Sequence, residues 1–339
     1  MSSREPRVSL PPLGVGTVSL GGLYSPTSTD EAAAMLRLAR QEGIRYFDTA
    51  PMYGLTTAER RLGWALAQEG GPQDWLVSTK VGRLMRPRRL VPPPSGTAEF
   101  GWRSSGPFVE QYDYSYDGIR RSIEDSLQRT GLDHFDVAYI HDIGELTHGA
   151  GNEQHLAALR GGGYRALYEL RSAGVVRAVG VGVNEIPALL TCLSEADLDC
   201  ALLAGRFTLL NQPDSDEVYE RCAEQGVQLI AGGALNGGAL AGGAYYDYAE
   251  APPPVRRRVA ELRAVCTRHG VSLLAAALQF VAANQYYACL LIGPRTEAEL
   301  RQSVAALREP VPARLWDELV ERGLVAARWR RSATAGAVQ

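Results

Sequence analysis

The chain contains a single lysine. Its 339 residues include 35 lysine and arginine residues, and all of them except Lys80 are arginine. Either residue serves as a surface cation, but only the compact ammonium of lysine has a pKa that responds readily to its surroundings. The lone lysine is therefore either a chance survivor of a strong arginine bias or a residue whose chemistry is needed.

Cysteine is scarce as well. The five cysteines are odd in number, widely spaced and without a Cys-x-x-Cys pair. This excludes a disulfide framework and a zinc ribbon, and it predicts reduced, mostly buried thiols. The four histidines other than His141 have no metal-ligand spacing, so we expect surface histidines and no metal. They are His134, His148, His155 and His269.

Long apolar runs are missing. The longest, Leu273 to Ala283, contains Gln279 and falls short of the ~20 residues that span a bilayer. The first residues carry Arg4 and Glu5 without the apolar segment of a signal peptide. We therefore expect a cytoplasmic protein that does not enter a membrane.

The chain also lacks an excess of basic charge. It has 38 acidic against 35 basic residues, a net charge of −3. Nucleic-acid-binding domains are usually basic, so that class is excluded and a small-molecule partner is expected. Hydrophobic residues make up 45% of the chain, enough for a large core. The oligomeric state stays open.

Strand-like and helix-like segments alternate about eight times along the chain. Predicted strands cover residues 13–17, 44–48, 75–80, 135–140, 176–183, 200–204, 227–230 and 288–292. Predicted helices cover residues 30–42, 57–68, 116–130, 164–173, 186–196, 215–224, 254–269, 272–284, 297–307 and 312–322. Such alternation indicates an α/β fold with a parallel sheet.

Two α/β architectures compete, a doubly wound sheet and a closed barrel. The first usually carries Gly-x-Gly-x-x-Gly, but Gly14-Val-Gly16 is followed by Ser19, and Gly180-Val-Gly182 by Glu185. The eightfold alternation favours a (β/α)8 TIM barrel.

No linker divides the chain, so we expect one barrel domain over residues 1–325 and a mobile C-terminal tail over residues 326–339. The segment Leu84 to Tyr114 lacks periodicity and is predicted to be a long substrate loop. A second, glycine-rich loop is expected from Ala231 to Gly243.

Polar side chains follow the predicted strands: Asp48 with Tyr53 just beyond it, Lys80, His141 with Asp142, and Asn184. In a barrel these strand ends form one face, where active sites are built. A phenol needs a nearby cation to act as a base near neutrality, and lysine can supply it and lower the pKa. An aspartate can hold the lysine, and a histidine can orient a substrate oxygen. This set suits proton transfer coupled to hydride transfer with a nicotinamide cofactor.

The chain resembles the aldo-keto reductases in several motifs. These are FDTAPMYG at residues 47–54, STKVGR at 78–83, YIHD at 139–142, VGVGVN at 179–184 and IGPRT at 292–296. The resemblance implies a (β/α)8 barrel that uses NADP or NAD. It places the catalytic Asp, Tyr, Lys and His tetrad of that family on Asp48, Tyr53, Lys80 and His141.

The same resemblance implies a cofactor site. Asn184 is expected to hold the carboxamide beside Gly182, and the Gly232 region takes the place of a stacking tyrosine. Gly293, Arg295 and Thr296 open the last helix of the barrel, where N–H groups favour phosphate. Arg295 and Thr296 then bind a 2′-phosphate, or Arg295 stacks on adenine, so NADP and NAD both stay open.

Within the family, segments such as DYSYDGIRRSIEDSLQRTGLDHFD at residues 113–136 are similar to aldose 1-dehydrogenases and pyridoxal 4-dehydrogenase. The expected function is NAD(P)-dependent oxidation of C1 of a free aldose to the lactone, with Tyr53 as general base. Trp102, Tyr24 and Asp142 are the substrate candidates. The alternatives are pyridoxal oxidation, reduction of an aldehyde or ketone, and, from another class, a non-catalytic barrel that binds the cofactor and regulates a partner.

Overall fold

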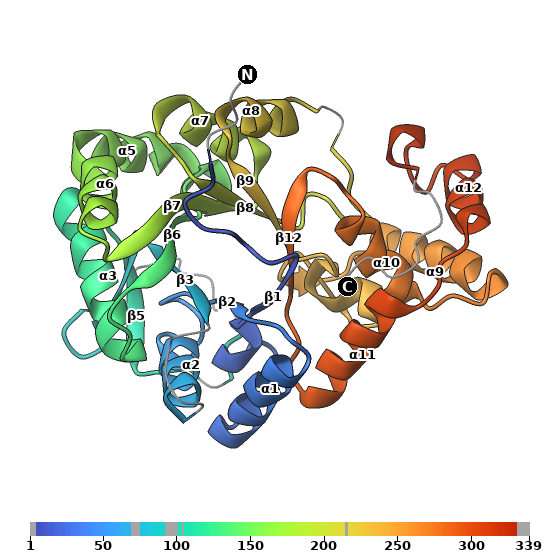
Figure 1. Ribbon diagram of the computed structural model, residues 1–339, viewed down its shortest axis with the longest axis horizontal. Helices are drawn as coiled ribbons and strands as arrows, with labels where there is room; N and C mark the ends of the chain where they lie inside the picture. The colour runs from blue at the N-terminus through green and yellow to red at the C-terminus, as the bar shows by residue number, and fades with distance from the viewer. Residues whose placement is uncertain (1–4, 69–74, 92–100, 104, 214–215, 331–339) are drawn as a thin grey trace.

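The computed structural model describes residues 5–68, 75–91, 101–103, 105–213 and 216–330. Within them, eight parallel strands close into a barrel in the order β1, β12, β9, β8, β7, β6, β3, β2 (Figure 1). Their bounds are β1 Leu13–Gly16, β2 Tyr46–Asp48, β3 Leu76–Val81, β6 Phe135–His141, β7 Val176–Val183, β8 Cys200–Ala204, β9 Gln228–Gly232 and β12 Tyr287–Ile292. The predicted TIM barrel is confirmed.

Helices surround this barrel and connect successive strands. They are α1 Thr29–Gln41, α2 Thr57–Gln68, α3 Tyr116–Thr130, α4 Glu145–His148, α5 Asn152–Ala158, α6 Tyr164–Ser172, α7 Ile186–Glu195, α8 Glu217–Gln225, α9 Pro253–Arg268, α10 Leu273–Ala282, α11 Glu297–Arg308 and α12 Ala313–Glu321. α1 begins in a capping box, where Ser28 and Glu31 satisfy each other's backbone N–H groups. The helices α9, α10 and α12 lie together on one side of the barrel (Figure 1).

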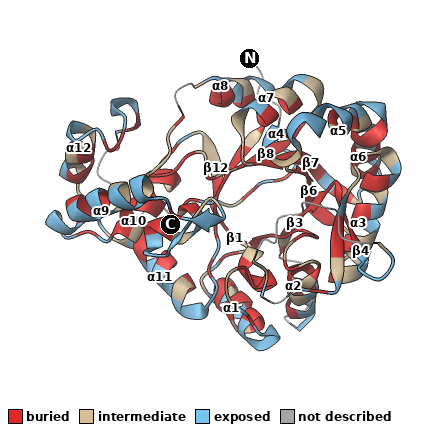
Figure 2. Ribbon diagram, turned by 180° about the vertical axis from the view of Figure 1, so that it is seen from behind, coloured by how far each residue is buried: buried red, intermediate tan, exposed pale blue. Residues whose placement is uncertain are grey.

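Two apolar cores hold the fold together. The larger lies between strands and helices, so the helices are buried on their inner faces and exposed outside (Figure 2). The smaller fills the barrel interior, where Tyr46 and Tyr139 lie with residues such as Leu291. The segment before β1 crosses one end of the barrel and adds Val8 and Leu10 to this interior core (Figure 1). The barrel interior is thus a packed core, and functional residues are expected at the ends of its strands.

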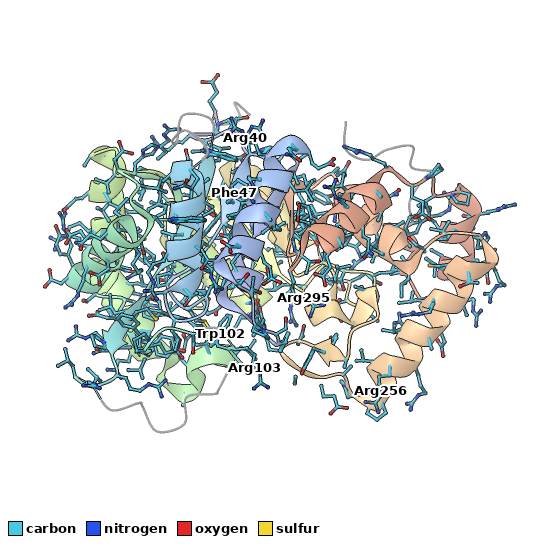
Figure 3. The ribbon with its side chains drawn as sticks, turned by 90° about the horizontal axis from the view of Figure 1, so that it is seen from below. Arg40, Phe47, Trp102, Arg103, Arg256 and Arg295 are labelled. Carbon is cyan, nitrogen blue, oxygen red and sulfur yellow. The ribbon has the colours of Figure 1, made fainter. Side chains whose placement is uncertain are left out.

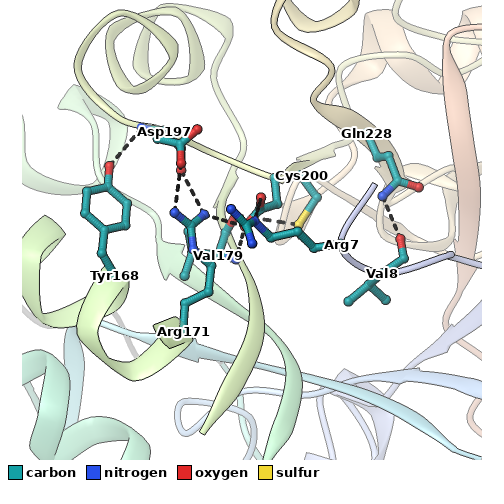
Figure 4. A network of polar contacts seen from close by, with 9 residues as sticks. Arg7, Val8, Tyr168, Arg171, Val179, Asp197, Cys200 and Gln228 are labelled. Carbon is teal, nitrogen blue, oxygen red and sulfur yellow. Dashed lines mark hydrogen bonds and ion pairs between the residues drawn. The ribbon is translucent and has the colours of Figure 1, made fainter. Parts of the chain in front are cut away.

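The amino ends of the strands are tied by a saturated polar network (Figure 4). Asp199 accepts hydrogen bonds from Arg171 at 2.7 Å, from Arg7 at 3.1 Å and from the backbone N–H of Val179 at 2.9 Å. Arg171 also pairs with Asp197 at 2.8 Å. Because each buried carboxylate oxygen of Asp199 has a donor, the network favours stability.

The expected substrate loop contains a pair of strands near its two ends. Strands β4 (Arg83–Pro87) and β5 (Phe108–Tyr112) pair antiparallel, with Arg83 opposite Tyr112. The prediction of an unstructured loop over residues 84–114 was wrong for these parts, because the short strands stabilise each other through distant pairing. Residues 92–100 and 104 of that loop lie outside the described residues.

The second expected loop also contains structure. A short 3₁₀ helix spans Asn236–Ala241, and beyond it strands β10 (Tyr245–Tyr246) and β11 (Ala249–Glu250) form a small hairpin. The turn of this hairpin consists of Asp247 and Tyr248, both with positive φ. Such turns usually take glycine or asparagine, so this hairpin is held against a conformational cost.

The start of the predicted mobile tail is packed. Residues Ala327–Trp329 form a 3₁₀ turn, and the Trp329 side chain is 5% exposed with its ring 4.9 Å from that of Phe207. Residues 331–339 lie outside the described residues. No single helix in the described ranges is long and apolar enough to cross a membrane; α9 and α10 pass that test only as a pair, by length and composition, and are bent by 97°.

Candidate active site

The structure brings the four tetrad candidates together at the carboxyl end of the barrel. Asp48 ends β2, Lys80 lies in β3 and His141 ends β6, and these three strands are neighbours. Tyr53 lies in the turn after β2. In Figure 3, Trp102 and Arg295 lie at this end of the molecule, opposite Arg40.

Lys80 is held by two acceptors at the carboxyl end of the barrel. Its Nζ donates to Asp48 Oδ2 at 2.6 Å and to the carbonyl of Thr49 at 2.9 Å, and both charged side chains are almost fully buried. The other oxygen of Asp48 accepts from Ser78 at 2.7 Å. Ser78 in turn lies 3.0 Å from the hydroxyl of Tyr46. This fixed ion pair has the arrangement that the sequence predicts for Asp48 and Lys80.

Tyr53 is half-buried above this pair. The Lys80 ammonium lies 4.7 Å from the centre of its ring, and the His141 ring meets it edge-on at 6.1 Å. Burial and the carboxylates of Asp48 and Asp142 raise the pKa of the Tyr53 phenol well above its ordinary value. The net shift is thus upward, whereas the sequence led us to expect a pKa lowered by Lys80, whose ammonium pairs with Asp48.

His141 is buried and neutral near physiological pH. Burial, Arg83 and Lys80 lower its pKa well below the ordinary value. Its Nδ1 is buried without a hydrogen-bond partner, while its Nε2 lies 3.4 Å from Asp142 Oδ2. A neutral imidazole in this position can share a hydrogen bond with a substrate oxygen.

A buried arginine was missed by sequence reasoning. Arg83 pairs with Asp142 at 2.5 Å and with Glu110 of β5 at 3.0 Å, and its side chain is 2% exposed. A signal was available, because Arg83 follows Lys80 by three residues in a stretch that is otherwise apolar. Its carboxylate partners are 27 and 59 residues away, so the sequence alone did not show the pairing.

Two histidines expected at the surface are packed instead. The rings of His148 and His155 lie 4.0 Å apart, and Nε2 of His148 is 3.0 Å from the hydroxyl of Tyr114. That hydroxyl donates to the carbonyl of His141 at 2.7 Å. Burial, with smaller effects of His155 and Arg83, lowers the pKa of His148 to about 4. This cluster supports the end of β6 from behind.

Of the substrate candidates, Trp102 lies next to the tetrad. Its ring is 6.4 Å from that of Tyr53, and it pairs with Leu23 in an isolated backbone bridge. Tyr24 stacks on Tyr245 of the small hairpin, with ring centres 3.9 Å apart and planes 5° from parallel. The Tyr24 N–H donates to the carbonyl of Gly101, next to Trp102, so these rings lie on joined segments, and we call the three rings the aromatic wall.

The residues expected to bind the nicotinamide end lie close to Lys80 and His141. Gly182 is opposite His141 in the β6–β7 register, and a Cβ at Gly182 would lie 3.6 Å from Lys80 Cε. Asn184 follows β7 and shares a hydrogen bond with Tyr248. Gly232 ends β9 opposite Ala204 of β8.

One further polar side chain fits a cofactor, and it was not predicted. Asn236 is 1% exposed, has a φ of 48°, and neither atom of its amide has a partner. A Cβ built on Gly205 would lie 3.8 Å from its Nδ2, so the amide lies between the ends of β8 and β9. A buried amide without partners costs free energy unless a ligand satisfies it, so this region fits a polar nucleotide.

The remaining cofactor candidates lie at the N-terminus of α11. Thr296 caps the helix by accepting from the N–H of Glu299, and Arg295 forms a side-chain pair with Glu299 at 2.7 Å. Gly293 precedes them, and its neighbour Pro294 accepts a 2.5 Å hydrogen bond from Ser19. The helix start fits a phosphate, but Glu299 already neutralises Arg295.

Comparison with known proteins identifies the family. A model of the Aldo/keto reductase family matches residues 12–322. The chain belongs to the aldo/keto reductase family. It is an NAD(P)-dependent oxidoreductase.

Two relatives in the family extend over almost the whole chain. A pyridoxal 4-dehydrogenase from Microbacterium luteolum is 43% identical over 92% of this chain and 94% of its own. A D-threo-aldose 1-dehydrogenase from Pseudomonas sp. is 37% identical over 96% of this chain and 99% of its own. Both are named as dehydrogenases.

Solved structures show the same fold. A glycerol dehydrogenase from Gluconobacter oxydans matches with a TM-score of 0.68 and 21% identity, covering 95% of this chain and 96% of its own. The holo form of an aldo-keto reductase from Bacillus halodurans matches with a TM-score of 0.67 and 22% identity, covering 94% and 95%. At this identity the likeness extends to the fold alone.

Proposed function

We propose that the protein oxidises C1 of a free aldose, in its cyclic hemiacetal form, to the lactone, with NADP or NAD as hydride acceptor. The observation that carries this proposal is the buried Lys80–Asp48 pair beneath Tyr53, with a neutral His141 at the edge of the same ring. The D-threo-aldose 1-dehydrogenase relative supports the substrate class.

In this reaction C1 loses a hydride and its hydroxyl loses a proton. Tyr53 takes the proton at its phenolate oxygen, and His141 positions the substrate oxygen by a hydrogen bond. The ammonium of Lys80 stabilises the phenolate form electrostatically, while Asp48 and Thr49 hold the ammonium in place. When bound, the nicotinamide supplies the site that accepts the hydride.

The residues that would hold the cofactor lie at the carboxyl end of the barrel. Asn184 and Gly182 would hold the carboxamide, and the amide of Asn236 would bind a polar group of the nucleotide. Arg295 and Thr296 at the start of α11, beside Gly293, would hold a phosphate. A Cβ at Gly232 would lie 3.1 Å from Leu202 and 3.3 Å from Ala204, so a larger side chain there would be crowded.

Pyridoxal is the second candidate substrate. The 43% identity to a pyridoxal 4-dehydrogenase favours it, and pyridoxal also forms a cyclic hemiacetal whose oxidation gives a lactone. Both substrates ask the same chemistry of Tyr53 and His141. The wall formed by Trp102, Tyr24 and Tyr245 suits either a sugar ring or a pyridine ring.

A substrate screen tests the proposal. Purified protein is mixed with L-fucose, other aldoses, pyridoxal and simple alcohols, each with NADP and with NAD, and nicotinamide absorbance is followed. We expect reduction of the cofactor with an aldose and a lactone as first product. Turnover of pyridoxal alone selects the second candidate, and turnover of simple alcohols without either hemiacetal refutes the proposal.

A further inference from the structure

A second carboxylate, that of Asp142, lies beside the imidazole of His141. Asp142 follows β6 directly, and its N–H donates to the carbonyl of Gly182 at 2.8 Å. Its φ is 47°, in the left-handed region that glycine adopts without cost. The backbone therefore holds this carboxylate at the reaction centre against a conformational cost, which points to a function for it.

Arg83 fixes this carboxylate from behind. One end of the guanidinium pairs with Asp142 and the other with Glu110, while its Cζ lies 5.1 Å from the ring centre of Tyr112. Burial works against the charge of Arg83, but the carboxylates of Asp142 and Glu110 outweigh it and raise its pKa. Burial likewise raises the pKa of Asp142, with Arg83 and Lys80 opposing the rise. The 2.5 Å ion pair favours the ionised carboxylate.

An ionised carboxylate accepts hydrogen bonds and donates none. Oδ2 of Asp142 is 3.4 Å from Nε2 of His141. A substrate oxygen that bonds to Nε2 therefore lies beside Oδ2 as well. A hydroxyl there can donate to the carboxylate, whereas a carbonyl oxygen brings only lone pairs and is repelled.

We propose that Asp142, anchored by Arg83, selects hydroxyl over carbonyl ligands at the reaction centre. While Tyr53 is protonated, Asp142 accepts a hydrogen bond from the hydroxyl on the reacting carbon. That hydroxyl turns to Tyr53 when the phenolate forms, and the carbonyl of the product has no hydrogen to donate to Asp142, which weakens its binding. This selection rests on the proposed function, since a hemiacetal has a hydroxyl at this carbon and its lactone has a carbonyl. It gives the dehydrogenase a means of releasing its product.

The variant Asp142→Asn tests the proposal, because an amide of the same shape can donate to a carbonyl oxygen, and asparagine tolerates a positive φ. The measured quantities are the KM of L-fucose and the competitive inhibition constant of its 1,5-lactone. We expect the KM to rise about tenfold and the inhibition constant of the lactone to fall about threefold. A merely structural role moves both constants upward together, and that result, or no change in either, overturns the proposal.

Glu110→Gln is the matched control. This substitution also removes one carboxylate charge beside Arg83, but at a position away from His141. The ratio of the KM of L-fucose to the inhibition constant of the lactone should therefore stay within about twofold of wild type. If Glu110→Gln shifts the ratio as Asp142→Asn does, the effect belongs to the charge of the network, and the proposal fails. Thermal unfolding of both variants verifies that they are folded.

The choice of probe separates this inference from the proposed function. If the wild-type protein oxidises pyridoxal and no aldose, the same two constants are measured for pyridoxal and its lactone. If it oxidises neither, the proposed function fails, and the dissociation constants of L-fucose and its 1,5-lactone are measured by calorimetry instead. Opposite shifts in Asp142→Asn support the selection by Asp142 with any of these pairs, and parallel shifts refute it.

Discussion

The two ends of the barrel carry backbone strain differently. In the described residues, every non-glycine residue with positive φ lies in a segment that follows the carboxyl end of a barrel strand. These residues are Tyr24, Leu55, Thr56, Asp142, Asn236, Asp247 and Tyr248. Turns at the other end use glycine for the same conformation, as Gly131 does after α3 and Gly226 after α8.

The buried polar groups beside the two ends also differ. At the amino end, Asp199 has three donors, and Asp136 accepts from the N–H of Val77 at 2.7 Å and from Arg177 at 2.9 Å. At the carboxyl end, His141 Nδ1 and the whole amide of Asn236 have no partner. The two aspartates are thus saturated, whereas His141 and Asn236 keep open hydrogen-bonding capacity that a ligand can use.

The largest effect is expected from Tyr53→Phe at the carboxyl end. Removing the hydroxyl removes the proton acceptor, so kcat should fall roughly 10²- to 10⁴-fold. Cofactor affinity should stay unchanged because the ring remains. Steady-state kinetics and a fluorescence titration with the cofactor measure the two quantities. A kcat within threefold of wild type removes Tyr53 from its role.

The pH dependence of the oxidation rate should follow the ionisation of Tyr53. Because the pKa of Tyr53 is raised well above its ordinary value, the phenol is protonated near neutrality and its phenolate fraction grows about tenfold per pH unit. The rate of oxidation should therefore climb from neutral toward alkaline pH without a plateau below about pH 10. His141 adds no inflection there, since its pKa is shifted down. Initial rates in a buffer series test this, and a plateau near neutrality contradicts it.

At the amino end, a substitution should change stability and spare catalysis. Asp199→Asn weakens the pairs with Arg171 and Arg7, so the free energy of unfolding should fall by about 1–3 kcal/mol. The kcat should stay at the wild-type value. Asp197→Asn is the control, because that side chain is 52% exposed and its loss should cost about 0.5 kcal/mol or less. Denaturant titrations and steady-state kinetics on the same samples measure the two effects. A large loss of kcat in Asp199→Asn would contradict the view that the amino end contributes to stability and not to catalysis.

Cofactor choice gives a smaller effect. If Arg295 leaves Glu299 to bind a 2′-phosphate, Arg295→Ala should raise the KM of NADP about tenfold and leave that of NAD unchanged. Glu299→Gln frees the guanidinium and should act in the opposite direction. An equal rise in the KM of both cofactors would indicate that Arg295 stacks on adenine. No change in either KM would mean that the phosphate is bound elsewhere.

The smallest effect is expected from Asn236→Gly, which tests the backbone strain at the carboxyl end. It removes a strained residue and an unpaired buried amide, so the free energy of unfolding should stay level or rise by up to about 1 kcal/mol. The dissociation constant of the cofactor should increase, because the amide is lost. The reciprocal change, Gly131→Ala, should lower stability by about 1–2 kcal/mol and leave cofactor binding unchanged. Calorimetry measures stability and binding in both variants.

Most of the barrel follows from local patterns in the sequence. The helices Thr57–Gln68 and Tyr116–Thr130 have the predicted bounds, because amphipathic periodicity and capping residues act within a few positions. The buried strands Val176–Val183 and Cys200–Ala204 were also predicted with their bounds, from runs of apolar residues. Such signals are local, so a single sequence carries them.

The site was predictable where it lies on strand ends. Asp48, Lys80 and His141 are brought together by the parallel register, which the strand pattern already implies. The pairing of Arg83 with Glu110 and the stacking of Tyr24 on Tyr245 depend on where two hairpins fold back, and no local pattern fixes that. The direction of the Tyr53 pKa was missed for the same reason, because the opposing carboxylates of Asp48 and Asp142 reach it only in the folded chain.

The burial of Lys80 has a practical consequence for chemical labelling. Since the chain has no other lysine, its folded surface offers no side-chain amine to acylating dyes, amine crosslinkers or acetylating enzymes. A reagent can acylate Nζ only in a molecule in which the Lys80–Asp48 pair has separated and Lys80 has become exposed. Acylation of this lysine, followed by mass spectrometry, therefore measures how often the pair opens, without a signal from any other lysine.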